Sequence, residues 1–297
     1  MTVMKFMARR FYAPMMLFGF NGAAIFLIGG GAPAFVLGGL LLAAIAVSFL
    51  IEQFIPYEAA WNRPHQDRLH DVLHFGVNEA SIAAAALTIP LIAAISPFTG
   101  LWPSEWPLWQ QVLIAILVAD FGITLTHWAS HRNEMLWRFH AIHHSVKRMY
   151  GFNGLMKHPL HQAVELAAGT APLALAGMPV DVAFLLAFAV AIQLLLQHTN
   201  VDVRVGPLKF LLALSPVHRF HHLKTAGEGD VNFGLFTNIW DWFLNTAYFE
   251  RKRRFASEDL GIGDQPDFPT GYFEQLAHPF RPTSADQDRN PDRKAAA

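Results

Sequence analysis

The sequence predicts an all-α integral membrane protein: a bundle of about four transmembrane helices, a shorter helical hairpin and a histidine-rich cap on the cytoplasmic side. The chain of 297 residues is 53% hydrophobic, and its mean hydropathy is +0.27. Only 15% of its residues are charged, whereas ordinary soluble domains have about 25%. Apolar stretches long enough to cross a bilayer recur along the chain, and histidines are grouped just after the fourth stretch.

The composition excludes several classes of function. The chain has no cysteine, so disulfides, thiolate ligands, cysteine-ligated iron–sulfur clusters and thiolate-ligated haem are ruled out. Its net charge is -1 and its basic residues are scattered, so we expect no nucleic acid as a partner. Any bound metal must therefore be held by nitrogen and oxygen donors.

The first two apolar stretches, residues 14–28 and 34–51, predict a helical hairpin. The glycines and the proline that connect them are typical of a tight turn. Lys5, Arg9 and Arg10 precede the first stretch, and residues 32–34 resemble a signal-peptide cleavage site. Because a second, longer apolar stretch follows at once, we expect a retained membrane anchor rather than a cleaved signal peptide.

A third stretch, residues 75–96, leads into a loop that holds Trp102, Trp106 and Trp109, and residues 111–128 form a fourth stretch. Tryptophan is enriched where a membrane meets water, so we expect this loop at headgroup level. Two further stretches, residues 163–176 and 182–197, are split by a glycine and a proline. They predict either two more spans or a hairpin that dips into the bilayer.

The distribution of positive charge predicts the orientation. Lysine and arginine occur before the first stretch, after the second and after the fourth, and they are absent from the two opposite turns. By the positive-inside rule, both termini and all the histidine clusters lie on the cytoplasmic side. We divide the chain into an N-terminal transmembrane region (residues 1–110), a histidine-bearing domain (residues 111–250) and a polar C-terminal tail (residues 251–297). The tail is rich in Pro, Asp and Arg, and we expect it to be disordered from about residue 282.

Eight histidines in three clusters are the most informative residues. The sequence HWASH contains His127 and His131, HAIHH contains His140, His143 and His144, and HRFHH contains His218, His221 and His222. Residues three and four apart on a helix share a face, so we expect each cluster to direct its imidazoles to one point. Eight imidazoles exceed what one tetrahedral ion takes, so the pattern predicts a cap that holds two metal ions. The alternative is a set of exposed histidines or of core histidines satisfied by hydrogen bonds.

An all-nitrogen site for two ions favours iron, because imidazole suits iron and a structural zinc needs only four ligands. Iron can activate O2, whereas zinc has no redox chemistry, although zinc could occupy the site in purified or crystallised protein. A lipid could slide from the bilayer to a site at the membrane surface. We therefore expect two Fe ions, O2 as co-substrate and a lipid substrate.

The spacing HxxxH, HxxHH, HxxHH resembles that of the fatty acid hydroxylase and sterol desaturase superfamily, as do the segments DFGITLTHWASH, LWRFHAIHHS, MKHPL, QHTNV, SPVHRFHH, NFG and IWDWF. The resemblance covers residues 120–249, and GYFEQLAHPF near Phe280 is similar to the tail of bacterial members. It implies a membrane-bound non-haem di-iron oxidoreductase that uses O2 and two external electrons to hydroxylate or desaturate a lipid. It also makes residues 111–250 the catalytic domain and favours a bacterial inner membrane over the endoplasmic reticulum.

Carried over by position, the resemblance makes the eight clustered histidines metal ligands and catalytic residues. It adds His198 in HTN and His158 in HPL as further ligands, with local hydrogen bonding as the alternative. Family members usually read HPLE where this chain reads HPLH, so His161 replaces an acid. Four polar residues are expected to orient the ligands or to fix loops around them: Asp120, Asn200, Asn232 and Asp241.

His70 and His74 are also four residues apart, and Glu79 follows them near the cytoplasmic start of the third stretch. The spacing of His70 and His74 would let both rings reach a metal, but no family motif covers these two residues. We expect them to have an interfacial or supporting role.

Other functions remain open at this point. A sterol or fatty acyl desaturase would use the same ligands as a hydroxylase. A metal transporter needs its ligands near the middle of the bilayer, and a bis-histidine haem protein needs opposed single histidines within spans. The lipid could be a sterol, a fatty acyl chain, a sphingolipid, an ether lipid, a carotenoid or an ornithine lipid.

The chain has no evident haem-, flavin- or cytochrome-like domain of its own. The resemblance therefore implies a separate electron donor, either a ferredoxin or a cytochrome, together with an NAD(P)H reductase.

Overall fold

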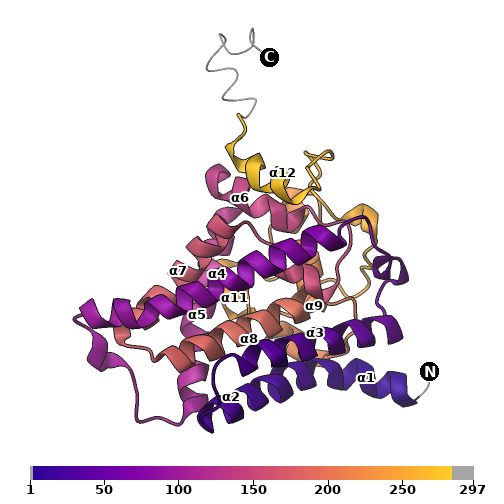
Figure 1. The fold of residues 1–297 in the computed structure, drawn as a ribbon. Coiled ribbons are helices and arrows are strands. Elements are labelled where there is room, and N and C mark those ends of the chain that lie inside the picture. Colours follow the sequence, from indigo (N-terminus) through magenta and orange to yellow (C-terminus); the bar gives the residue numbers. More distant parts are fainter. Residues whose placement is uncertain (1–2, 283–297) are drawn as a thin grey trace, which may run out of the picture.

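The computed structural model describes residues 3–282, apart from the side chain of Thr99 (Figure 1). Within that range the chain is helical, and extended pairing is limited to three isolated bridges. This confirms the predicted all-α class. Almost all of the predicted disordered stretch, residues 283–297, lies outside the described residues.

Five helical stretches are long and apolar enough to cross a membrane. They are the continuous run Val3–Gly29, α3 (Val36–Phe54), α4 (Arg68–Ile95), α5 (Leu108–Ser130) and α8 (Val180–His198). The first run consists of α1 (Val3–Pro14), a π-helical segment η1 (Met15–Phe20) and α2 (Asn21–Gly29). Pro14 has no N–H to give to the preceding turn, and the widened η1 segment follows it directly.

The predicted hairpin is formed by α7 (Pro159–Ala176) and α8, and Gly177 ends α7 with a positive φ of 92°. The far end of α7 reaches the far end of α4, where the Ser96 hydroxyl donates to the Leu175 carbonyl over 2.6 Å. The hairpin therefore runs as deep as the neighbouring α4, which favours two crossings over a shallow dip.

Helix α8 lies in the centre of the bundle, where it contacts α2, α3, α4 and α5 (Figure 1). Every residue from 188 to 198 is buried, as expected for a helix that is hydrophobic all round. Helices α5 and α7 approach closely, because Gly122 has no side chain to collide with the backbone of Ala168. This packing fixes the ends of α5 and α8, from which histidines project.

Short elements form a cap beyond the histidine ends of α5 and α8. They are η2 (Ala59–Asn62), α6 (Glu134–His144), η4 (Gly151–Leu155), η5 (Gly206–Phe210), α9 (Ser215–His221), α10 (Ala226–Gly229), α11 (Ile239–Leu244), η6 (Ser257–Asp259), α12 (Tyr272–Ala277) and η7 (His278–Phe280). The described part of the predicted tail belongs to this cap, because Phe255 and Leu260 share a small core with Trp61, Met149 and Phe220.

The opposite loop contains η3 (Thr99–Leu101) and the three tryptophans. Trp106 and Trp109 are about half exposed, at 49% and 54%, which fits an aromatic belt. Trp102 is instead buried, and its indole N–H donates to the Gln111 side-chain carbonyl over 2.7 Å. One of the three tryptophans therefore braces the loop from within.

Candidate metal centre

Nine histidines come together in two neighbouring groups. Within each group the candidate ligand atoms all lie within 4.8 Å of one another. The first group consists of His127, His131, His140, His144 and His221, and the second of His143, His198, His218 and His222. All eight clustered histidines and His198 are thus brought together as the sequence predicts.

The spacing of the ring nitrogens suits metal ligation. In the first group the Nε2 of His144 is 3.1 Å from that of His131 and 3.0 Å from that of His140. In the second group the Nε2 of His218 is 3.2 Å from that of His198 and 3.1 Å from that of His222. Two nitrogens on one ion at metal–nitrogen distances of about 2.0–2.1 Å lie about 2.9–3.4 Å apart. The observed distances fall in that interval.

Hydrogen bonds at Nδ1 orient several of these rings. The Nδ1 of His127 is 2.8 Å from the Phe233 carbonyl, and that of His221 is 2.9 Å from the Val231 carbonyl. A carbonyl can only accept, so Nδ1 carries the proton and Nε2 carries the lone pair. The buried Nε2 atoms of His127 and His221 have no hydrogen-bond partner among the described residues. A metal ion would satisfy them, so the donor set fits an ion.

Each HxxHH cluster divides between the two groups, which corrects the expectation that one cluster serves one point. His140 and His144 face the first group and His143 the second, whereas His218 and His222 face the second and His221 the first. Positions four apart differ by only about 40° around a helix. His143 and His221 are each next to one of these positions, so their side chains point about 100° away. Each HxxHH cluster therefore lies between the two groups and contributes to both.

Burial keeps these imidazoles neutral. It lowers the pKa of all six histidines of the two HxxHH clusters well below 6.5, and neighbouring imidazoles lower each pKa further. For His131, burial lowers the pKa and Asp230 opposes this shift. A metal binds the neutral imidazole, so no proton has to be displaced near pH 7.

His158 lies outside both groups. Its Nδ1 accepts from the Leu160 backbone N–H over 3.1 Å and caps α7, and its Nε2 is 3.3 Å from the Leu276 carbonyl. His158 therefore makes local hydrogen bonds, which was the alternative to metal ligation.

His161 borders the first group. Its ring centroid is 4.6 Å from that of His140, and its Nε2 is 2.8 Å from the Ser130 hydroxyl. Glu165 follows one turn later and pairs with Lys157. His140, His161 and Glu165 form a third cluster of potential ligands. An acid is therefore present beside His161, four residues beyond the position where the family usually has one.

Three of the predicted polar residues act on one loop. Asn232 donates to the carbonyls of Val217 and Tyr248, and Asp241 accepts from the N–H groups of Phe233 and Gly234. Asp120 accepts from the N–H groups of Phe236 and Thr237 farther along the loop. None of the three bonds to a histidine ring, but they hold the loop whose carbonyls orient His127 and His221.

Asn200, the fourth predicted polar residue, fixes the segment after His198. Its side-chain amide donates to the Glu58 carbonyl and to the Asn62 side chain. The carboxylate of Glu52, which the sequence analysis missed, accepts from the Asn200 backbone N–H on the same segment. Glu52 directly follows the apolar stretch 34–51 and lies within α3, and a buried acid near a membrane span is costly. This position is the signal that could have identified it.

Sequence reasoning also missed Asp230 and Asn153. The Asp230 carboxylate is 2.9 Å from the Nδ1 of His131, and the Asn153 side-chain oxygen is 3.2 Å from the Nδ1 of His198. Asp230 lies in a loop and Asn153 in the short element η4, and no local sequence signal marks either residue.

His70 and His74 are in neither group, in agreement with the expected supporting role. The Nε2 of His74 is 2.8 Å from the Gln275 side-chain oxygen, and its Nδ1 is 3.1 Å from the Lys157 carbonyl. His74 therefore joins α4 to α12 and to the segment before α7.

A cavity of about 640 Å³ opens onto the first group, where His131, His144 and His221 line it. Arg132, Lys224 and Asp264 make part of its wall polar, and Trp137 and Ile262 make another part apolar. A molecule with both characters could reach the first group by this route.

Comparisons with known proteins agree with this geometry. A family model described as fatty acid hydroxylase matches residues 112–246, a segment that contains every histidine of both groups. The chain is 34% identical over 248 residues to an ornithine lipid hydroxylase of Rhizobium tropici, and the alignment covers 80% of this chain and 74% of that protein.

Two further relatives match over shorter regions. Alkylglycerol monooxygenase of Danio rerio is 31% identical over 178 residues, which cover 58% of this chain and 36% of that protein. A very-long-chain aldehyde decarbonylase of Oryza sativa is 27% identical over 179 residues, which cover 54% of this chain and 28% of that protein. No solved structure matches the chain.

The first two relatives are named as a lipid hydroxylase and a monooxygenase, which confirms the expectation of a lipid hydroxylase enzyme. With the family model and the long alignment to the bacterial relative, the chain belongs to the fatty acid hydroxylase family.

Proposed function

We propose that this protein is a membrane-bound di-iron oxygenase that hydroxylates a C–H bond of a lipid. The balanced reaction converts R–H, O2, two electrons and two protons into R–OH and water. The observation that carries the proposal is the convergence of nine buried imidazoles into two groups, with Nε2 atoms facing one another at 3.0–3.2 Å.

The two groups would hold one iron each. When bound, the iron pair supplies the redox chemistry that activates O2. The carbonyls of Phe233, Val231 and Met156 accept Nδ1 protons and keep the Nε2 atoms of His127, His221 and His143 directed inward. The rings are buried, so water is kept from most of the centre.

The lipid would approach through the cavity beside the first group. Its polar wall, with Arg132, Lys224 and Asp264, suits a polar headgroup. Its apolar side, with Trp137 and Ile262, suits the adjoining hydrocarbon. This arrangement favours a lipid whose oxidised carbon is close to its headgroup. The names of the first two relatives mention an ornithine lipid and an alkylglycerol, both of which combine a polar group with hydrocarbon.

The histidine centre and both termini would lie on the cytoplasmic side of a bacterial inner membrane. Arginine and lysine are concentrated at the end of the bundle that carries the cap, as the positive-inside rule requires. A cytoplasmic ferredoxin or cytochrome, reduced by an NAD(P)H reductase, could then deliver electrons to this end.

The test combines metal analysis with isotope labelling. Protein purified without oxygen should contain about two iron ions per chain. With lipid extract, ¹⁸O2 and a reduced ferredoxin, it should give products that carry one ¹⁸O atom. Absence of iron, or label that enters only from water, would exclude the oxygenase. Products that have only lost two hydrogens would instead favour the desaturase.

A further inference from the structure

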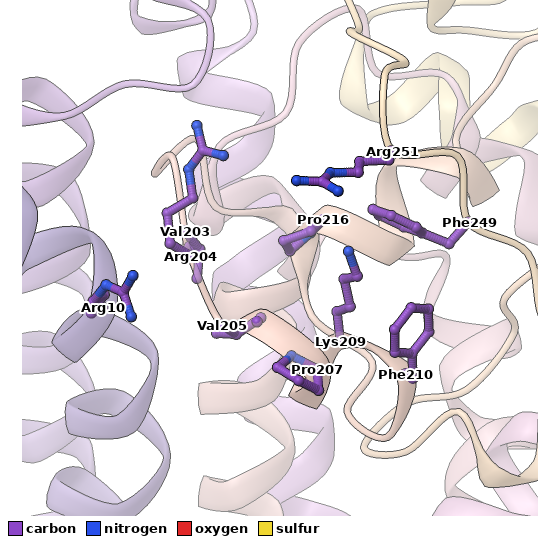
Figure 2. Close-up of a pocket in the computed structure, with 11 residues that line it drawn as sticks. Arg10, Val203, Arg204, Val205, Pro207, Lys209, Phe210, Pro216, Phe249 and Arg251 are labelled. Atoms are coloured by element: carbon purple, nitrogen blue, oxygen red, sulfur yellow. The ribbon is translucent and has the colours of Figure 1, made fainter.

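A second cavity, of about 700 Å³, lies at the cap end of the bundle and shares no lining residue with the cavity beside the first histidine group. It is bordered by α1 at Arg10, by the segment that contains η5, by the first turn of α9 and by the segment after α11. Figure 2 shows its side chains around an open space. Its character is set by Arg10, Arg204, Lys209, Arg251, Phe210 and Phe249.

The lining of this cavity carries four cations and no acid. Of these four cations, only Arg204 has a carboxylate partner within residues 3–282, namely Asp202 at 3.2 Å. Arg251 extends toward the side where Arg204 lies, and Lys209 extends toward Arg251 from below (Figure 2). Like charges gathered in a concave site repel one another and attract an anion.

The site is held in shape before any ligand binds. The Lys209 ammonium lies 3.8 Å from the ring centroid of Phe249 and 5.1 Å from that of Phe210. The Arg204 backbone N–H donates to the Arg9 carbonyl over 2.9 Å, and Arg9 pairs with Asp202 at 3.0 Å. These bonds fix α1 against the segment after α8, so Arg10 and Arg204 keep their relative positions.

The cavity is at the depth of the lipid phosphates. The helical run Val3–Gly29 has 27 residues, which is about 40 Å at 1.5 Å per residue and exceeds a hydrocarbon core of about 30 Å. The first turns, including Arg10, therefore reach the headgroup region. Leu208, Phe210 and Leu211 beside the cavity are nearly half exposed, which suits contact with acyl chains.

We propose that this cavity binds the phosphate of an anionic phospholipid headgroup. A guanidinium group can donate to two phosphate oxygens at once, and Lys209 adds a further positive charge. Phe210 and Leu211 would contact the glycerol and acyl part of the lipid. The bound lipid would brace residues 199–217, which connect His198 to His218 in the second histidine group. Lipid occupancy would therefore stabilise that part of the centre without entering the reaction.

The test measures binding and thermal stability of the full chain in neutral detergent. Phosphatidylglycerol should raise the melting temperature by roughly 5 °C at saturation, and phosphatidylcholine should not. The double variant Lys209→Gln/Arg251→Gln should bind phosphatidylglycerol about 10- to 30-fold more weakly. If the double variant does not fold, the single variant Arg251→Gln serves instead, because Arg251 is exposed. It should weaken phosphatidylglycerol binding about 3- to 5-fold.

The matched control is Arg63→Gln/Lys252→Gln, which removes the same charge at two exposed residues outside the cavity. It should bind phosphatidylglycerol within about twofold of the parent. Inorganic phosphate could stabilise the parent as strongly as the lipid does and leave the cavity variant unchanged. That result would support a phosphate-binding site and would identify free phosphate as its ligand.

Three results would overturn the proposal. The first is equal binding of phosphatidylglycerol and phosphatidylcholine. The second is an equal loss of phosphatidylglycerol affinity in the cavity variant and the control variant. The third is a cavity variant that keeps its lipid affinity but no longer binds an acidic electron-donor protein. The last result would identify the cavity as a protein docking site. None of these measurements depends on oxygenase activity, so their failure leaves the proposed function untouched.

Discussion

His131 and Asp230 are 99 positions apart in the chain, yet the Nδ1 of His131 lies 2.9 Å from a carboxylate oxygen of Asp230. The other ring nitrogen of His131 is 3.1 Å from the Nε2 of His144 in the first group. One side of the imidazole is thus held by a carboxylate while the other faces the candidate metal position. Carboxylates that receive the second N–H of a ligating histidine orient the ring and raise its basicity.

Asp230→Ala should weaken iron binding or turnover about 10- to 100-fold, because the Nδ1–H of His131 would lose its acceptor. Asp230→Asn keeps an oxygen at the same place and should lose less. Iron content after dialysis against a weak chelator measures the effect. Asp267→Asn changes an exposed carboxylate outside the cavity and should behave like the parent. Equal effects of Asp230→Ala and Asp267→Asn would remove Asp230 from its positioning role.

His221→Ala and His143→Ala should each abolish product formation and lower bound iron from about two ions per chain to about one, because each removes a nitrogen from a different group. Iron quantification and product analysis on purified protein check both points. His65→Ala, at an exposed histidine outside both groups, is the matched control. Full turnover by either variant would show that the mutated histidine is not a ligand.

Metal-free protein should become less stable as the pH falls below about 6.5. Burial lowers the pKa of His140, His144 and His222 from 6.5, so the unfolded chain binds more protons than the folded chain in this range. Each such group contributes up to about 1.4 kcal/mol per pH unit, and this stability is present above pH 6.5 and lost on acidification. Melting temperatures of chelator-treated protein between about pH 7.5 and pH 5.5 test the sign. A flat profile would mean that these rings are not buried in the neutral form.

Glu52→Ala should lower the free energy of unfolding by about 3–6 kcal/mol, because several buried donors lose their acceptor. The Glu52 carboxylate accepts from the N–H of Gly151 over 2.8 Å, from the Thr199 hydroxyl over 2.9 Å and from the N–H of Asn200 over 3.1 Å. Glu52→Gln keeps one side-chain oxygen and should lose less than half of that amount. Denaturant unfolding in detergent gives the values, and equal losses in both variants would contradict this account.

Gly122→Ala should destabilise the bundle by about 1–3 kcal/mol, because the added methyl group would collide with the backbone of Ala168 where α5 meets α7. Gly38→Ala adds the same methyl group in α3 with no atom within 4 Å. That variant should be neutral, or more stable by up to about 1 kcal/mol through helix propensity. Thermal unfolding of the pair compares the two positions, and equal stability of the variants would argue against a close α5–α7 contact.

The helical class could be predicted from composition and from the spacing of apolar stretches, because a bilayer requires long apolar helices. The turn at Gly30 and the hairpin around Gly177 followed from local residues, since glycine and proline grouped between two apolar stretches are typical of a turn. The depth of that hairpin was left open, because residues 163–176 are short for a full crossing. The contact between Ser96 and Leu175, which lie far apart in the chain, favours two crossings.

The eight clustered histidines could be found because their spacing is local and matches the helical repeat. His198 is a single histidine, and only the superfamily resemblance selected it. His158 occurs in an equally suggestive motif, but its ring caps α7 instead. A lone histidine gives no sign of which partner it will meet, because that depends on how separate helices pack.

The sequence by itself therefore determined the membrane class, the helical architecture and the identity of most candidate ligands, all of which depend on patterns within a few turns of one helix. The tertiary structure alone decided which histidine serves which group, that Asp230 holds His131 and that Glu165 lies beside His161. The division of each HxxHH cluster between two groups requires partners from α5, α8 and α9 on both sides of α6. Such contacts join residues far apart in the chain, and the packing of the helices around α8 fixes them.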